Sequence, residues 1–140
     1  MEAVNPVVVD SSVAFKWLHH LDETNVDAAN ALLNEHERGS MLVTAPAGLH
    51  AELANALRYS ALPQDEVLSL IDTLGGYRIE LVPATPARLG AAVRLSYRHG
   101  MSVYDALFLA LAEELGCPLV TADRRAFAGI DSPVEIRLLL

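Results

Sequence analysis

Short apolar runs and longer stretches of helical periodicity alternate along the chain. The short runs are rich in valine, isoleucine and leucine and are bounded by turn residues or acids, as interior strands are. We expect strands at 7–9, 41–43, 79–82, 119–122 and 134–138. Helical segments lie between most of these runs, and strands separated by helices predict an α/β domain with a parallel sheet.

Helix boundaries follow from apolar residues three and four positions apart and from the residues that cap each end. Thr85-Pro86 is a typical start, because threonine caps a helix and proline fits its first turn. Gly100 and Gly116 are typical ends. We expect a short helix capped at 11 or 12 and reaching 18, then helices at 26–37, 46–60, 63–76, 85–99 and 103–115.

The segment 102–123 carries the strongest pattern in the chain. From 103 to 112 the helix is apolar on nearly every face, so we expect it to be buried. Asp105 is the only charge in that stretch, and a carboxylate in such surroundings must be paired, bound to a metal or at the floor of a wet cleft. The helix stops at Gly116, and the strand that follows it delivers Asp123 at its carboxyl end.

Three further placements suggest that acids converge. Asp10 follows the first strand and Asp123 follows the fourth, and ligands of open parallel sheets bind outside the carboxyl ends where the strand order reverses. Asp105 begins the helix that leads into the fourth strand. Glu52 lies at the border of the apolar stripe of its helix. The four acids could therefore share one crevice at the end of the sheet.

Carboxylates gathered in one crevice are the ligands that hard divalent cations prefer. Magnesium or manganese held in this way can activate water and neutralise charge on a scissile phosphate. The sequence thus predicts metal-assisted hydrolysis of a phosphodiester, with the same four residues as catalytic and metal-binding groups: Asp10, Glu52, Asp105 and Asp123.

Each acid also has a purely structural explanation. Asp10 could cap the helix that follows it, and Asp105 could complete a capping box with Ser102. Glu52 could be solvated at the edge of its stripe, and Asp123 could start a turn. These explanations stay open for any single acid, but two strand ends and a buried helix direct the four toward the same place.

Composition and charge narrow the class of protein. A chain of 140 residues with 52% hydrophobic and 20% charged residues forms one domain, 1–140, and is not disordered. Cys117 is the only cysteine, which excludes a disulfide framework and a thiolate zinc site. No apolar run approaches the ~20 residues of a membrane span, and no secretory signal begins the chain, so we expect a cytoplasmic protein.

The net charge of −8 is unusual for a protein that binds nucleic acid through a broad basic patch. A phosphate-bearing substrate would need metal cations or local arginines, for which Arg124 and Arg125 are the best candidates because they follow Asp123 directly. Two competing folds fail on single residues. A response-regulator receiver needs a lysine after its last strand, and Lys16 is the only lysine; a haloacid-dehalogenase-type phosphatase needs an aspartate where Ser12 stands.

Four blocks of the chain resemble the PIN-domain family, and in size and layout the VapC-type toxin ribonucleases. They occur in the family's order and span nearly the whole chain: Val-Val-Val-Asp-Ser-Ser-Val at 7–13, Glu-Leu-Ala-Asn-Ala-Leu at 52–57, Ser-Val-Tyr-Asp-Ala at 102–106 with Leu-Ala-Leu-Ala at 109–112, and Leu-Val-Thr-Ala-Asp at 119–123.

The resemblance implies a three-layer domain with a five-stranded parallel sheet flanked by helices. It also implies a Mg²⁺- or Mn²⁺-dependent endoribonuclease that forms a homodimer and is blocked by a small VapB-type antitoxin. By position, the family's acidic quartet corresponds to the four acids named above, and Ser12, Asn55 and Thr121 match its supporting polar residues. The rival function is a catalytically silent PIN domain that binds proteins; the intact quartet favours the enzyme.

Overall fold

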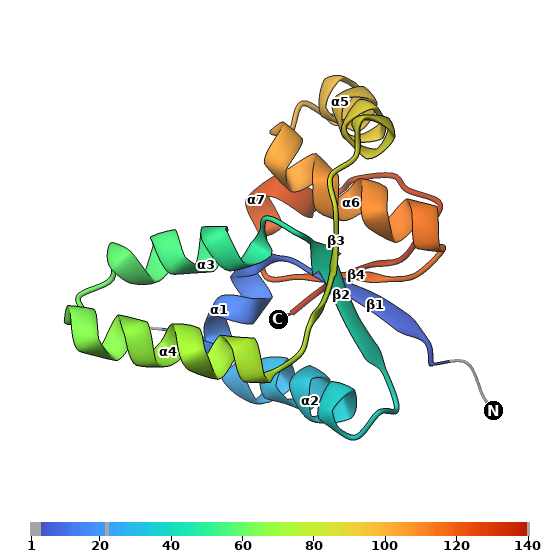
Figure 1. The fold of residues 1–140 in the computed structure, drawn as a ribbon. Helices are drawn as coiled ribbons and strands as arrows, with labels where there is room; N and C mark the ends of the chain where they lie inside the picture. The colour runs from blue at the N-terminus through green and yellow to red at the C-terminus, as the bar shows by residue number, and fades with distance from the viewer. Residues whose placement is uncertain (1–3, 22, 140) are drawn as a thin grey trace.

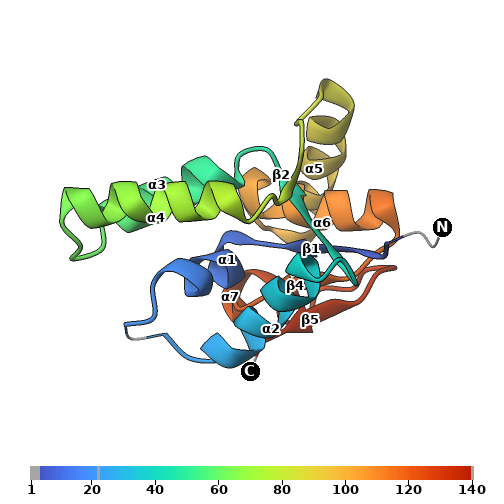
Figure 2. The same ribbon diagram turned by 60° about the horizontal axis from the view of Figure 1, so that its bottom comes forward.

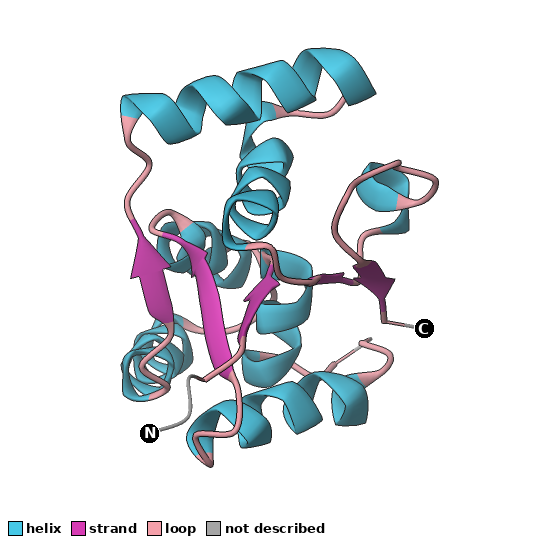
Figure 3. Ribbon diagram, turned by 90° about the vertical axis from the view of Figure 1, so that its right-hand side faces the viewer, coloured by secondary structure: helices cyan, strands magenta, loops and turns pink. Residues whose placement is uncertain are grey.

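A five-stranded parallel sheet with the strand order β3-β2-β1-β4-β5 forms the centre of the computed structural model (Figures 1 and 3). The structure describes residues 4–21 and 23–139. The strands are β1 (Pro6–Val9), β2 (Leu42–Pro46), β3 (Glu80–Val82), β4 (Leu119–Thr121) and β5 (Ile136–Leu138). The α/β class and the parallel sheet predicted from the sequence are therefore confirmed.

Seven helices connect the strands in the described part of the chain. They are α1 (Ser11–Leu18), α2 (Val26–Glu37), α3 (Leu49–Arg58), α4 (Gln64–Gly76), α5 (Pro86–His99), α6 (Val103–Leu115) and α7 (Arg124–Phe127). Helix α6 covers one face of the sheet, and α1 and α2 cover the other (Figure 2). Helices α3 and α4 pack together and extend beyond the sheet, as both views show (Figures 1 and 2).

Helix α6 is the buried helix that the sequence predicted. Its apolar side chains from Phe108 to Ala112 are buried, and the helix packs on β1, β2 and β4. The Ser102 hydroxyl accepts a hydrogen bond from the backbone N–H of Asp105 (3.0 Å) and so caps the helix. Gly116 ends it with φ +62°, a left-handed conformation that costs glycine no Cβ clash. The cap and the stop fix where Asp105 begins and where β4 starts.

Several boundaries differ from the sequence-based prediction, and the largest differences are at the end of β2 and the start of α3. A helix was expected to open at Pro46, but Pro46 ends β2 and α3 begins only at Leu49. The reason is the ladder to β3, which continues past the proline: Pro46 is in register with Val82, and the Ala47 N–H donates to the Val82 carbonyl (2.9 Å). The prediction also lacked α7, a single turn too short to carry an apolar period.

The strand order creates a switch point beside β1. From β1 the chain moves outward through β2 and β3 and then crosses back to β4, which pairs with the other side of β1. The carboxyl ends of β1 and β4 are consequently neighbours at the position where ligands bind to open parallel sheets. Across residues 4–21 and 23–139, no helix has the length and apolar character that crossing a membrane requires.

Candidate functional site

Asp10 lies directly after β1, and its side chain caps α1. Its Oδ1 atom accepts hydrogen bonds from the backbone N–H groups of Ser12 (3.1 Å) and Val13 (3.3 Å). The side chain is only 4% exposed. The structural explanation of Asp10 as a helix cap is therefore correct, but it accounts for only one of the two carboxylate oxygens.

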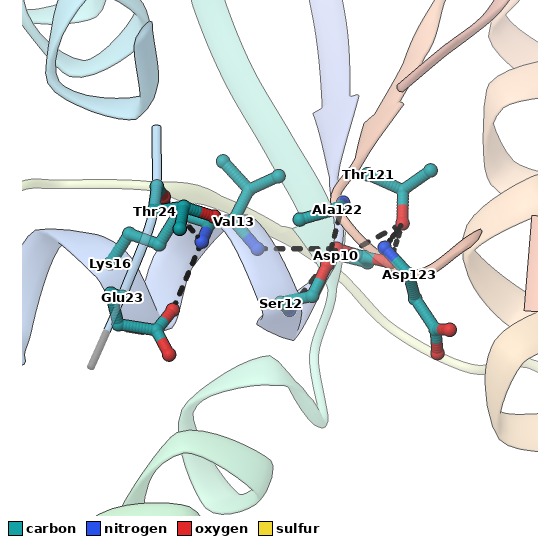
Figure 4. A network of polar contacts seen from close by, with 9 residues as sticks. All are labelled: Asp10, Ser12, Val13, Lys16, Glu23, Thr24, Thr121, Ala122 and Asp123. Atoms are coloured by element: carbon teal, nitrogen blue, oxygen red, sulfur yellow. Dashed lines mark hydrogen bonds and ion pairs between the residues drawn. The ribbon is translucent and has the colours of Figure 1, made fainter. Parts of the chain in front are cut away.

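Two hydroxyl groups connect the Asp10 carboxylate to the end of β4 (Figure 4). The Ser12 hydroxyl donates to Asp10 Oδ1 and accepts from the Ala122 N–H (2.8 Å). The Thr121 hydroxyl donates to Asp10 Oδ2 (2.5 Å) and accepts from the Asp123 N–H (3.0 Å). Each hydroxyl thus donates one hydrogen bond and accepts another. Together the two hydroxyls fix both carboxylate oxygens relative to β4, the strand that precedes Asp123.

Ser12 and Thr121 therefore occupy supporting positions around Asp10, as their match to the PIN pattern implies. Asn55, the third such residue, is exposed on α3. Within the described residues, no hydrogen bond joins its side chain to the Asp10 network. Its supporting role stays a prediction.

The other three acids approach the same place from three elements. Glu52 lies in the first turn of α3, Asp105 in the first turn of α6, and Asp123 at the amino end of α7. The Asp123 carboxylate accepts a hydrogen bond from the Ala126 N–H (3.2 Å), so Asp123 is also a cap. The capping contact of Asp105 uses its backbone N–H and not its carboxylate, although a side-chain hydrogen bond with Ser102 also lowers the pKa of that carboxyl against the effect of burial.

Shifted pKa values show that these acids affect one another. Burial, together with the charges of Asp105 and Asp10, raises the pKa of Glu52 to about 7. Burial also raises the pKa of Asp10 to about 6, against the lowering effect of its hydrogen bonds from Ser12, Thr121 and Val13, and the charge of Asp123 adds to the rise. The pKa of Asp105 is likewise raised, by burial first and by the charge of Asp123.

These shifts distinguish a site from a set of unrelated caps. A carboxylate whose only role is to cap a helix has its pKa lowered by the helix N–H groups. Here the pKa rises for Asp10, Glu52 and Asp105, because burial and the neighbouring acids outweigh the hydrogen bonds. Raised carboxylate pKa values in one place are typical of functional sites.

Asp105 and Asp123 line the same polar groove, which has a volume of about 490 Å³. We call it the Arg125 groove, because Arg125 also lines it, together with Ser102 and His99. The sequence predicts Arg125 as a phosphate contact but gives no indication of His99. Nothing in its spacing identified this histidine, which reaches the groove because α5 ends beside the connection to α6.

The four acids do not form a closed metal cage as they stand. In the portion of the chain that is described, no three His, Cys, Asp or Glu side chains lie close enough to enclose a metal ion. Asp10 is held by protein donors, and the like charges of the others repel one another. The structure brings the acids within electrostatic reach of one another, and their role as metal ligands stays a prediction.

Substituting Thr121 tests the link between Asp10 and β4. Thr121→Val keeps the shape of this fully buried side chain but leaves Asp10 Oδ2 without its donor and the Asp123 N–H without its acceptor. We expect the free energy of unfolding to fall by about 1–3 kcal/mol, as for other buried groups that lose a partner. Urea unfolding measures this, and Thr121→Ser, which keeps the hydroxyl, should retain most of the stability. Equal losses in both variants would contradict the role of the hydroxyl.

The raised pKa values predict how stability depends on pH. Glu52 has a pKa of about 7 in the folded protein against an ordinary 4.5, and Asp10 about 6 against 3.8. The folded state therefore binds more protons than the unfolded state over this interval, so stability present below about pH 4 is lost as the pH rises through about 7. We expect the Tm in chelator to fall across that range, and Glu52→Gln to reduce the fall.

Repulsion between the acids also predicts how neutralising one of them changes the Tm at about pH 8. Asp105→Asn should raise the Tm in chelator, because it removes one of the repelling charges. Magnesium should raise the Tm of the wild type and do less for the variant. Asp72→Asn, on the exposed surface of α4, is the control and should change neither value. If Asp105→Asn is less stable in chelator and neither protein responds to magnesium, the acids act only as caps.

Comparisons with known proteins agree with this geometry. Residues 7–132 match the PIN domain family. Ribonuclease VapC1 of Mycobacterium tuberculosis is 31% identical over 134 residues, covering 85% of this chain and 99% of the relative. Ribonuclease VapC3 of Pyrobaculum aerophilum is 32% identical over 124 residues, covering 85% of this chain and 90% of the relative.

Solved structures share the fold. VapBC2 of Rickettsia felis, bound to a promoter DNA fragment, has a TM-score of 0.69 at 15% identity and covers 93% of this chain and 96% of its own. VapC20 of Mycobacterium tuberculosis, a toxin that cleaves the sarcin–ricin loop, has a TM-score of 0.64 at 16% identity and covers 88% and 90%. The predicted five-stranded PIN-like fold is thereby confirmed, and the chain belongs to the PIN-domain family, among its VapC-type members.

Proposed function

We propose that this protein is a metal-dependent endoribonuclease and the toxin of a VapBC-type toxin–antitoxin pair. The observation that carries the proposal is a group of four acids within electrostatic reach of one another near the ends of β1 and β4. Burial and neighbouring acids raise the pKa values of three of them, Asp10, Glu52 and Asp105. Two relatives above 30% identity, named ribonucleases, support RNA as the substrate. A cytoplasmic homodimer is part of the same proposal.

The donor set fits Mg²⁺ or Mn²⁺. All four groups offer carboxylate oxygens, which hard divalent cations prefer, and a cation would relieve the repulsion that helps to raise the pKa of Glu52. The residues that would hold it are Asp10, Glu52, Asp105 and Asp123. Such an ion lowers the pKa of a bound water and neutralises charge on the scissile phosphate.

The protein's own groups prepare this site in two ways. Ser12 and Thr121 fix the orientation of the Asp10 carboxylate, so it does not have to reorganise when it acts. The short turn of α7, capped by Asp123 and anchored by buried Phe127, fixes the direction of the Asp123 backbone. Orientation by partner groups of this kind is usual around carboxylate metal ligands.

A basic antitoxin is the partner that this chemistry favours. Several solved structures of the same fold are toxin–antitoxin complexes, including one from Klebsiella pneumoniae with a TM-score of 0.64 at 18% identity. A groove lined by Asp105 and Asp123 can pair with an arginine or lysine through charge-assisted hydrogen bonds. We infer that the antitoxin blocks the site by putting such a cation where the metal would bind.

One observation favours the rival function, a silent PIN domain that binds proteins. Asp10 already accepts hydrogen bonds from Ser12, Val13 and Thr121, and in the described ranges no ready-made metal cage exists. A protein-binding module would need the acids only as a docking surface. Measurement of RNA cleavage separates the two functions.

Substitution of the acids tests the enzyme. We expect Asp10→Asn, Asp105→Asn and Asp123→Asn each to remove most of the cleavage of total RNA in magnesium or manganese, because each loses a ligand that supports water activation and charge neutralisation. Glu52→Gln should be impaired as well. The control Asp72→Asn should cleave as the wild type does, and chelator should abolish cleavage by both. Full activity in chelator, or in the Asp105→Asn protein, would overturn the mechanism.

Competition between the metal and the antitoxin tests the partner. If a basic antitoxin side chain occupies the acidic site, saturating magnesium should weaken binding of the antitoxin that co-purifies with the protein. Neutralising Asp105 and Asp123 should weaken it further and remove the effect of magnesium. Calorimetric titration of the pair with and without magnesium measures both effects. An affinity that ignores both changes would exclude this mode of inhibition.

A further inference from the structure

We propose that a single RNA strand crosses the end of β4, with an unpaired base in a hollow beside Phe15 and a backbone phosphate on Arg125. The inference rests on the proposed ribonuclease function and adds two subsites, one in the Phe15 hollow and one in the groove that Asp105 and Asp123 line. It follows from the positions of two hollows, the charges that line them and the way in which each lining residue is held.

The two hollows adjoin at consecutive residues of the chain. One, the Phe15 hollow, has a volume of about 410 Å³ and is lined by Ser12, Phe15, Ala56 and Ala122, among others. The other is the Arg125 groove of about 490 Å³, to which Asp123 contributes. The N–H groups of Ala122 and Asp123 donate hydrogen bonds to the two hydroxyls of the Asp10 network. A strand that passes from one hollow to the other would therefore run over Ala122 and Asp123, beside the Asp10 network.

The Phe15 hollow is suited to a base and not to a phosphate. Lys16 lines it, but the Lys16 ammonium already donates to Glu23 Oε1 (3.0 Å) and to the Thr24 carbonyl (2.7 Å), with a side chain only 6% exposed. With Lys16 and Glu23 paired to each other, the hollow offers a ligand the Phe15 ring and the methyl groups of alanines, beside two serines. Phe15 also stacks on His19, with ring centroids 5.2 Å apart, which limits its motion. Unpaired bases bind on aromatic side chains in this way.

The Arg125 groove has the opposite chemistry. Arg125 is exposed on α7, and no ion pair within the described residues occupies its guanidinium. A phosphate in this groove would lie beside Asp105 and Asp123, so it needs a cation to offset their repulsion. Guanidinium binds phosphate through two parallel hydrogen bonds. In a chain with a net charge of −8, this arginine supplies the cationic contact to phosphate that a broad basic surface supplies in other nucleic-acid-binding proteins.

This arrangement selects a single strand over a duplex. A base can enter the Phe15 hollow only when it has left its stack, whereas the backbone beside it stays extended toward Arg125. Paired RNA keeps its bases stacked and inaccessible to side chains in its deep, narrow major groove. The site therefore fits loops, bulges and ends of RNA.

A binding experiment with two adjacent arginines tests the phosphate subsite. Arg124 and Arg125 are both exposed on α7, but only Arg125 lines the groove. The probe is a fluorescent single-stranded oligoribonucleotide of mixed sequence, titrated in magnesium with the Asp10→Asn protein so that it is not cleaved. We expect Arg125→Gln to weaken binding and to reduce the slope of log affinity against log salt by about 0.7, the value of one single-strand phosphate contact. Arg124→Gln should leave the slope unchanged.

A second pair of variants tests the base subsite. Phe15→Leu should weaken binding by about tenfold, within the range for loss of one base–aromatic stack, without changing the salt slope. Phe15→Trp keeps an aromatic face and should restore the affinity, which a purely structural role of Phe15 would not allow. A duplex of the same sequence should bind more weakly than the single strand. The titrations are repeated in Asp105→Asn, which should also lose most of its cleavage, so a folding defect of Asp10→Asn cannot decide the result.

The outcomes separate this inference from the proposed function. If the wild type cleaves RNA and the acid variants do not, but Arg125→Gln behaves as Arg124→Gln does, the phosphate subsite is wrong. If Phe15→Leu binds normally, or Phe15→Trp fails to restore binding, the base subsite is wrong. If the oligoribonucleotide neither binds nor is cleaved by the wild type, the ribonuclease function itself fails.

Discussion

The buried carboxylate of Asp10 connects the fold to the site, because it can be buried only if both of its oxygens are satisfied. Four donors do this: the N–H and hydroxyl of Ser12, the N–H of Val13 and the hydroxyl of Thr121. Three come from the helix that follows β1 and one from β4. This one group therefore connects the start of α1 to the end of β4, directly before Asp123.

The same arrangement places like charges close together in a domain that must stay folded. Burial and mutual repulsion raise the pKa values of Glu52 and Asp10 to about 7 and about 6, so ionisation near neutral pH opposes folding. The apolar core offsets this cost. The strands around β1 and the buried side of α6 supply it, with Val8, Val9 and Leu109 fully inaccessible. Loss of stability at a site held ready for its ligand is a usual consequence of function.

Most elements could be predicted because their signals are local. The caps at Thr85 and Ser102 and the glycine stops at Gly100 and Gly116 are adjacent to the helices they bound, and both caps form as expected. The strand ends at Asp10 and Asp123 could be recognised for the same reason. The hydrogen bond from Thr121 to Asp10 joins residues 111 positions apart, and no local pattern specifies which oxygen it reaches. The hollows and the turn of α7 likewise depend on contacts that only the folded chain creates.

The buried pair of Lys16 and Glu23 has a consequence for the surface of the protein. Lys16 is the only lysine in the chain, and its ammonium group is enclosed in an ion pair. Every exposed, permanently cationic side chain is therefore an arginine, with a guanidinium that stays charged at any physiological pH. Acetylation, which removes charge from lysines, has no exposed side-chain amine to modify, so a cell could not adjust the charge of this surface by that route.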